Sequence, residues 1–381
     1  MWQATLCVFV LVACSTRTKP QEGGVPAAEH APARAHASAP PSAPDAGHSV
    51  SAFVLAGGVV FGLGKQNLLI DSGRIVAVGV SRDAATRVVD VGGRYVVPGF
   101  IDSHVHLAYY SEGAAELASN GIVAVLDLGA PIGALSVDHA PLRVLDAGPM
   151  ITAPAGYPTN SWGAGGYGLG VGSPAEGSAA VEMLFKAGVR AIKVPLTSAP
   201  TLDDATVKAV VAAAHARNLK VYTHALEEQN AARAAEDGID VLAHTPTEPL
   251  SEATLEAWKT RTVISTLSAF GGSEAALNNL RALRERGSRV LYGTDFGNTR
   301  ETNIQSLEIT QLMAAGMDGE SIVKAGTSVP AEFLGLTDWG TLEVGKRASF
   351  LVLAADPTVD PHTLSQPIAV YVDGTMLSAG L

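Results

Sequence analysis

A chain of 381 residues in which 47% are hydrophobic and 17% charged has the balance of a soluble globular protein with a sizeable core. Its net charge of −11, with no basic stripe along the chain, argues against a nucleic-acid-binding surface. The length allows one large domain and a smaller one.

The N-terminal segment resembles an export signal. Residues 6–13 are apolar, and Leu11-Val12-Ala13-Cys14 is similar to a bacterial lipobox, whose cysteine is acylated and becomes the first mature residue. The apolar run is shorter than the ~20 residues that span a bilayer, and residues 1–5 lack the usual Lys or Arg. We expect a signal peptide at 1–14 and a lipoprotein anchored through Cys14 in the cell envelope (periplasm or outer membrane), or a secreted protein. The alternative is a plain apolar terminus.

Only two cysteines, Cys7 and Cys14, are present, and cleavage before Cys14 would remove the first. The mature chain would therefore have no disulfide and no cysteine metal site. Residues 15–50 are rich in Ala, Pro, Ser and Gly and almost lack large apolar side chains, which predicts a disordered linker.

Two β-rich flanks enclose the central part of the chain. Residues 51–97 form short β-type runs separated by glycine turns, and such runs return at 339–353 and 368–372. The simplest arrangement joins both flanks, 51–97 and 340–381, in one composite β domain, a small β-sandwich.

Between the flanks, residues 98–339 alternate strand and helix patterns. Eight strands with helices between them predict an α/β fold of the (β/α)8 TIM-barrel type, whose usual size is ~250 residues. The predicted strands are 100–106, 122–128, 143–147, 191–194, 220–224, 241–244, 262–266 and 289–294, and predicted helices include 179–187, 204–217, 229–237, 251–259 and 273–286. A doubly wound sheet is the rival, but no Gly-x-Gly-x-x-Gly turn follows the first strand.

Six polar side chains lie inside or at the ends of these predicted strands. His104 and His106 close the first strand and, being two residues apart, point to the same face. Active sites of such barrels lie at the carboxyl ends of the strands, and imidazole is a common metal ligand, so we expect one metal site. Singly, each residue has an ordinary alternative, such as a hydrogen-bonded core histidine, a snorkelling lysine or a helix-capping aspartate. The six are His104, His106, Lys193, His224, His244 and Asp295.

The motif from Pro98 to His106 (PGFIDSHVH), the lysine of the fourth strand, the two later histidines and Gly293-Thr294-Asp295 resemble the amidohydrolase superfamily. The resemblance covers residues 51–375 and is nearest to imidazolonepropionase-like and prolidase-like members. It implies a carboxylated Lys193 that bridges two divalent metal ions. Nitrogen and oxygen ligands suit zinc best. Relatives often have Gly-Gly-His where this chain has Ala155-Gly156-Tyr157, a departure that bears on the substrate.

The resemblance also implies how the ligands divide. His104, His106 and Asp295 would hold the inner ion, and His224 and His244 the outer one. The expected activity is a binuclear metal-dependent hydrolysis of the C–N bond in a small amide, dipeptide or cyclic amide, with Asp295 moving the proton. A lactonase or esterase on the same ions, and a metal-containing binding lipoprotein without turnover, are the alternatives.

Four aromatic residues are candidate substrate contacts. Tyr157, Trp162 and Tyr167 lie in a Gly-rich loop, 156–172, after the third strand, and Tyr109 follows the first strand. Long loops at a barrel mouth often bind or cover substrate. We expect a small-molecule substrate and no nucleic acid, and the oligomeric state stays open.

Overall fold

The structure is a computed structural model that describes residues 51–379. The predicted signal peptide at 1–14, with Cys14, and the predicted linker at 15–50 lie outside the described residues. Within 51–379, no helix combines the length and the apolar character needed to cross a bilayer.

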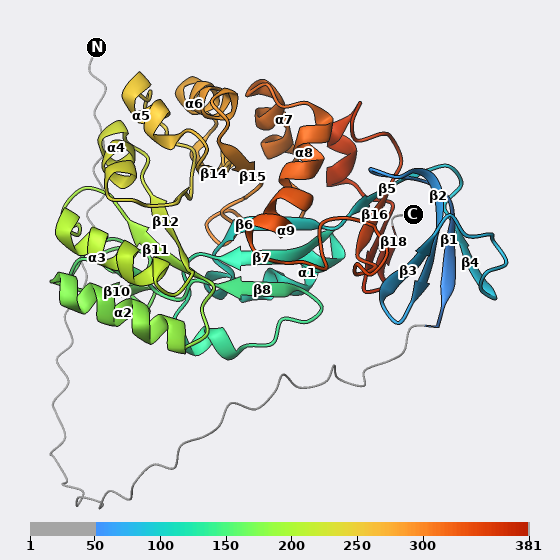
Figure 1. The fold of residues 1–381 in the computed structure, drawn as a ribbon, viewed down its shortest axis with the longest axis horizontal. Coiled ribbons are helices and arrows are strands. Elements are labelled where there is room, and N and C mark those ends of the chain that lie inside the picture. The colour runs from blue at the N-terminus through green and yellow to red at the C-terminus, as the bar shows by residue number, and fades with distance from the viewer. Residues whose placement is uncertain (1–50, 380–381) are drawn as a thin grey trace, which may run out of the picture. The chain divides into compact units, whose positions relative to one another are not determined.

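Strands from both flanks join in one mixed sheet (Figure 1). Its order is β18-β17-β16-β5-β1-β2-β3, and β4 pairs with β1. The flanks meet where β5 and β16 pair antiparallel, with Val97 opposite Leu351. The strands are β1 Phe53–Val60, β2 Gly64–Asp71, β3 Arg74–Val78, β4 Arg87–Asp90, β5 Tyr95–Pro98, β16 Phe350–Leu353, β17 Ala369–Val372 and β18 Thr375–Ala379.

The two flanks share one hydrogen-bonded network, in which β4 and β5 both pair with β1. The two facing layers of a β-sandwich are not resolved as separate sheets in it. Strand segments were expected from residue 339 onward, and this was wrong, because β16 begins only at Phe350. Gly340 and Gly345 have φ of +83° and +89°, a left-handed conformation that turns the chain and interrupts an extended run.

The central strands are parallel and, in the described residues, fall into the groups β6-β7-β8, β9-β10 and β11-β12-β13-β14-β15. They do not form the single closed sheet that was expected, although backbone hydrogen bonds connect the first and last strands: the Ser103 N–H donates to the Tyr292 carbonyl over 2.9 Å. The strands are β6 Phe100–Val105, β7 Ile122–Asp127, β8 Arg143–Asp146, β9 Met150–Thr152, β10 Gly168–Gly170, β11 Ala191–Pro195, β12 Lys220–His224, β13 Val241–Leu242, β14 Thr262–Ile264 and β15 Arg289–Leu291.

All eight predicted central strands therefore occur, most of them shorter than expected. The sequence did not predict β9 and β10, which pair across the first part of the Gly-rich loop and place Leu169 beside Ile151. Glycine has low strand propensity, so the motif Gly168-Leu169-Gly170 gave no strand signal.

Helices connect the strands, and several have a serine or aspartate N-cap, as expected for helix N-termini. The Ser173 hydroxyl accepts from the Glu176 N–H at the start of α2, and the Asp203 carboxylate does the same for Thr206 in α3. The helices are α1 Ala114–Ser119, α2 Pro174–Lys186, α3 Asp204–His215, α4 Glu228–Glu236, α5 Glu252–Trp258, α6 Glu274–Glu285, α7 Ser306–Ala314, α8 Gly319–Ala325 and α9 Ser328–Phe333.

The innermost strands are buried along their whole length. Every residue of β6 and β7 is buried, as in parallel strands covered on both faces. Polar side chains in β6 are thus removed from water, and each needs a partner inside the protein.

Candidate metal centre

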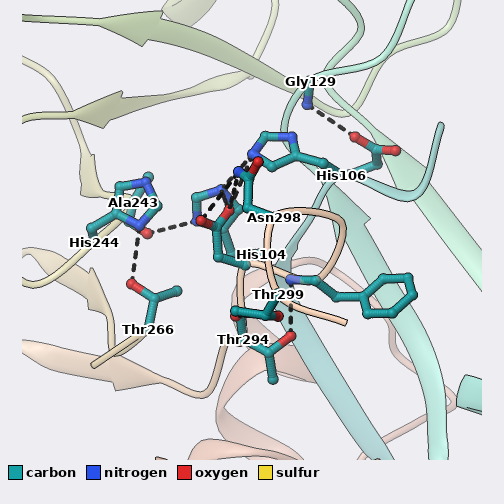
Figure 2. Close-up of polar contacts among 12 residues, drawn as sticks. His104, His106, Gly129, Ala243, His244, Thr266, Thr294, Asn298 and Thr299 are labelled. Carbon is teal, nitrogen blue, oxygen red and sulfur yellow. Dashed lines mark hydrogen bonds and ion pairs between the residues drawn. The ribbon is translucent and has the colours of Figure 1, made fainter. Parts of the chain in front are cut away.

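Three donor atoms converge at the carboxyl end of β6, and Figure 2 labels the two histidines among them. His104 Nε2 lies 3.3 Å from His106 Nε2 and 3.4 Å from Asp295 Oδ1, and His106 Nε2 lies 3.2 Å from Asp295 Oδ1. The three residues are at most 4% exposed. Donors placed tetrahedrally at ~2.0–2.1 Å from a zinc ion are about 3.3–3.4 Å apart. The spacing and chemistry of this cluster therefore fit a single small cation.

The histidines are held in the form that binds metal. His104 Nδ1 lies 2.7 Å from the Ala243 carbonyl, and His244 Nδ1 lies 3.0 Å from Thr266 Oγ1. With Nδ1 carrying the proton in that hydrogen bond, His104 keeps an Nε2 lone pair for an ion. Burial holds the pKa of His104 and His244 well below the usual range, so both rings are neutral.

Asp295 is a buried but ionised carboxylate. Burial favours a higher pKa, yet the hydrogen bond from His106 and electrostatic interactions with His104, His106 and Lys193 lower the pKa of Asp295 to about 2. Its φ is +56°, an uncommon conformation for a residue with a side chain, and its N–H donates to the His104 carbonyl over 2.9 Å. Asn298 Nδ2 lies 3.3 Å from each carboxylate oxygen.

A second buried carboxylate, which the sequence analysis did not single out, supports the centre. Asp102 is fully buried and accepts hydrogen bonds from the His104 N–H at 3.0 Å, the Thr294 N–H at 3.2 Å and the Thr294 hydroxyl at 2.5 Å. It therefore joins the end of β6 to the segment after β15. The available signal was its place two residues before His104 in an apolar strand, on the same face.

A cavity of about 260 Å³ opens beside the three donors. Lys193, His224 and His244 line it together with His106 and Asp295. Burial lowers the pKa of Lys193 to about 7, and burial, followed by the charge of Lys193, lowers the pKa of His224 to about 3. The His244 ring lies 4.4 Å from that of His104 and 4.8 Å from that of His224. Five of the six expected residues thus line one cavity, and the sixth, His104, lies directly behind it against His106 and His244.

The four candidate substrate residues divide into two pairs. Tyr157 and Trp162 line the cavity, whereas Tyr109 and Tyr167 pack behind Trp162, with ring centres 5.1 and 5.3 Å from it. Sequence reasoning missed the remaining lining residues, of which Phe270 has the largest side chain. Its only signal was its place in the loop after a predicted strand. The others are Met150, Ala269 and Asn298.

Comparison with known proteins places the chain in a family. Residues 95–377 match the amidohydrolase family. The chain belongs to the amidohydrolase family. Solved structures of similar fold indicate the TIM-barrel class for the central part of the chain.

Individual relatives are distant. Adenine deaminase of Deinococcus deserti is 28% identical over 76% of this chain and 53% of its own length, so the chain spans about half of that protein. Imidazolonepropionase of Deinococcus radiodurans is 27% identical over 75% of this chain and 84% of its own. The crystal structure of an Xaa-Pro dipeptidase with bound methionine has a TM-score of 0.74 at 20% identity and covers 86% of this chain and 99% of its own.

Proposed function

We propose that the protein is a binuclear metal-dependent amidohydrolase that cleaves the C–N bond of a small amide, dipeptide or cyclic amide. The single observation that carries this proposal is the triangle of donor atoms from His104, His106 and Asp295, with sides of 3.2–3.4 Å. Two imidazoles and a carboxylate buried at this spacing favour a cation between them. The family relationship supports the same chemistry.

We assign one ion to His104, His106 and Asp295 and the other to His224 and His244. Lys193 is 1% exposed, and a pKa of about 7 leaves a large neutral fraction at neutral pH. The neutral amine can attack carbon dioxide: the nitrogen forms a bond to carbon, one C–O π bond opens, and a proton leaves to solvent. The resulting carbamate would give both ions an anionic oxygen ligand. Zinc suits this donor set.

When bound, the ions polarise the substrate carbonyl and bring the pKa of water toward neutrality. The remaining work belongs to the protein. Asp295, ionised and pointing into the cavity, accepts the proton of the attacking water and delivers it to the leaving nitrogen. Asn298, whose amide lies 3.3 Å from both carboxylate oxygens, orients this side chain.

The decisive test pairs metal analysis with kinetics. The purified protein should contain about two divalent ions per chain and hydrolyse members of a panel of amides, dipeptides and cyclic amides. Asp295→Asn should retain most of the metal and lose about 10²–10⁴-fold in kcat. Asp71→Asn, at the exposed end of β2, is the matched control and should keep full activity. Full activity of Asp295→Asn removes Asp295 from this role, and a metal-free, inactive protein refutes the proposal.

The same panel should include lactones and esters, because an alcohol leaves more readily than an amine from the same site. Preferential turnover of those substrates would establish the lactonase alternative, and metal binding without turnover the binding-protein alternative.

We further propose that residues 98–339 are the catalytic domain and that the protein is exported and anchored at Cys14. Membrane fractionation of cells that express the full chain tests the anchor. The wild type should sediment with membranes, and Cys14→Ser should not. Equal distribution of the two would refute the anchor and leave the hydrolase proposal untouched.

A further inference from the structure

The space above the metal centre is bounded by aromatic rings, each of which lies against one of the histidines. The Trp162 ring lies 5.1 Å from that of His106, Tyr157 5.2 Å from that of His224, and Phe270 4.6 Å from that of His244. All three line the cavity. A substrate whose reacting carbonyl is at the centre therefore has its remaining part between aromatic walls.

These walls contain an oriented hydrogen-bond donor. Trp162 Nε1 donates to the Tyr157 hydroxyl oxygen over 2.9 Å. A tyrosine hydroxyl keeps its proton at neutral pH. Because one lone pair of that oxygen is used by Trp162, the O–H is free to donate elsewhere, for example to the carbonyl oxygen of an amide.

The walls also lack a cation that could neutralise a substrate carboxylate. Among the described residues that line the cavity, Lys193 is the one Lys or Arg, and it belongs to the metal centre. Arg300 lies outside the lining, with its guanidinium carbon 5.5 Å from the Tyr109 ring centre and 4.6 Å from that of Tyr110. A carboxylate pressed against rings without a partner is strongly disfavoured.

Size narrows the range of substrates further. The cavity of about 260 Å³ is smaller than the ~300–1,000 Å³ of pockets for drug-sized ligands. From the aromatic walls, the Tyr157 donor, the missing cation and this volume, we propose that the site selects small uncharged amides that carry a flat aromatic group. Amides with a carboxylate remote from the scissile bond, dipeptides included, are disfavoured. The selectivity is a choice of substrate only if the protein hydrolyses amides, so this inference rests on the proposed function.

The test uses two ligands of the same size that differ in one charge, terephthalamide and terephthalamate. Ligand-observed NMR titration of the full-length protein, metal-loaded and after chelator treatment, gives both affinities, and a thermal melt verifies that each form is folded. We expect terephthalamide to bind at least tenfold more tightly than terephthalamate to the chelator-treated protein. A carboxylate can bind a metal ion directly, so the comparison of affinities is made on the chelator-treated protein, provided that this form is folded. If the chelator-treated protein is unfolded, the comparison is made on the metal-loaded protein, with benzoate as the reference for direct binding to metal.

Variants identify the wall that is responsible. Phe270→Leu should weaken terephthalamide about 3- to 10-fold, the usual worth of an aromatic contact. Phe185→Leu, at a 38% exposed phenylalanine of α2, is the matched control and should change nothing. Equal or tighter binding of terephthalamate overturns the proposal, and loss of that advantage in Arg300→Ala would show Arg300 to be the carboxylate site. No binding of terephthalamide also overturns it.

Failure of the proposed function has a different signature. A protein without metal or turnover that still prefers terephthalamide would refute hydrolysis and keep the selectivity. A protein that hydrolyses dipeptides faster than uncharged aryl amides would refute the selectivity and keep hydrolysis.

Discussion

His104 donates from Nδ1 to the carbonyl oxygen of Ala243 over 2.7 Å, and Ala243 immediately precedes His244. One residue of the metal centre is therefore oriented by the backbone that carries another. Movement of the chain after β13 would displace His104 and His244 together, which couples the two proposed ion sites through a single hydrogen bond.

The partner of His244, unlike that of His104, is a side chain and can be removed. Thr266→Val deletes the hydroxyl 3.0 Å from His244 Nδ1 and leaves a side chain of similar shape. Loss of such an outer partner typically lowers metal affinity about 10- to 100-fold. Competition with a chelating dye should show this loss for one of the two ions. Thr310→Val, at an exposed position of α7, should leave both affinities unchanged.

Asp102 should be important for folding because it accepts three hydrogen bonds in a buried setting. Asp102→Ala leaves the Thr294 donors and the His104 N–H without an acceptor, and we expect the free energy of unfolding to fall by about 1–3 kcal/mol or more. Urea denaturation measures the loss. Asp71→Ala, at an exposed position, should change stability by no more than ~0.5 kcal/mol. Equal stability of the two variants would contradict the bridging role.

Lys193 should make the stability of the metal-free protein depend on pH. Its pKa is about 7 in the folded chain and ~10.4 when unfolded, so between these values the unfolded state holds the extra proton. The free energy of unfolding therefore rises with pH across this window. Below pH 7, the folded protein is destabilised by the full cost of burying the charged Lys193. The unfolding free energy of wild type minus that of Lys193→Met should therefore rise by roughly 4 kcal/mol from pH 6.5 to 10.

This measurement requires chelator-treated protein in buffer free of carbon dioxide, because a carbamate at Lys193 would remove the titrating amine. Other groups that titrate above pH 8 contribute equally to both proteins and cancel in the difference. A difference that stays constant with pH would show that Lys193 keeps an ordinary pKa.

Glu308 holds the loop that carries Phe270. It is fully buried, and its carboxylate accepts from the N–H groups of Leu267 at 3.1 Å and Ser268 at 2.7 Å. Glu308→Gln replaces one acceptor with a donor, so we expect a loss of about 1–3 kcal/mol in stability and a higher KM with little change in kcat. Glu320→Gln on the exposed face of α8 should show neither effect. A fall in kcat alone would argue against positioning.

The strands of the centre were predictable because buried parallel strands have a strong apolar signature, and all eight occur within a few residues of their predicted bounds. The glycine turns before β16 were expected, but the strand segments expected between them were not found, because β-type residues beside glycine fit both a strand and a turn. Gly293 shows the limit of local rules: a side chain there would overlap Ile264, a packing constraint set by a strand far away in sequence.

By itself, the sequence determined which groups can bind metal and which strands carry them, because a period of two places His104 and His106 on one face and a family motif accompanies them. Only the tertiary structure decided that the donors of His104, His106 and Asp295 lie 3.2–3.4 Å apart. It also decided that Asp102 joins the end of β6 to the segment after β15, and that Phe270 lines the cavity. These relations depend on how loops pack between elements distant in sequence, and local periodicity carries no record of that packing.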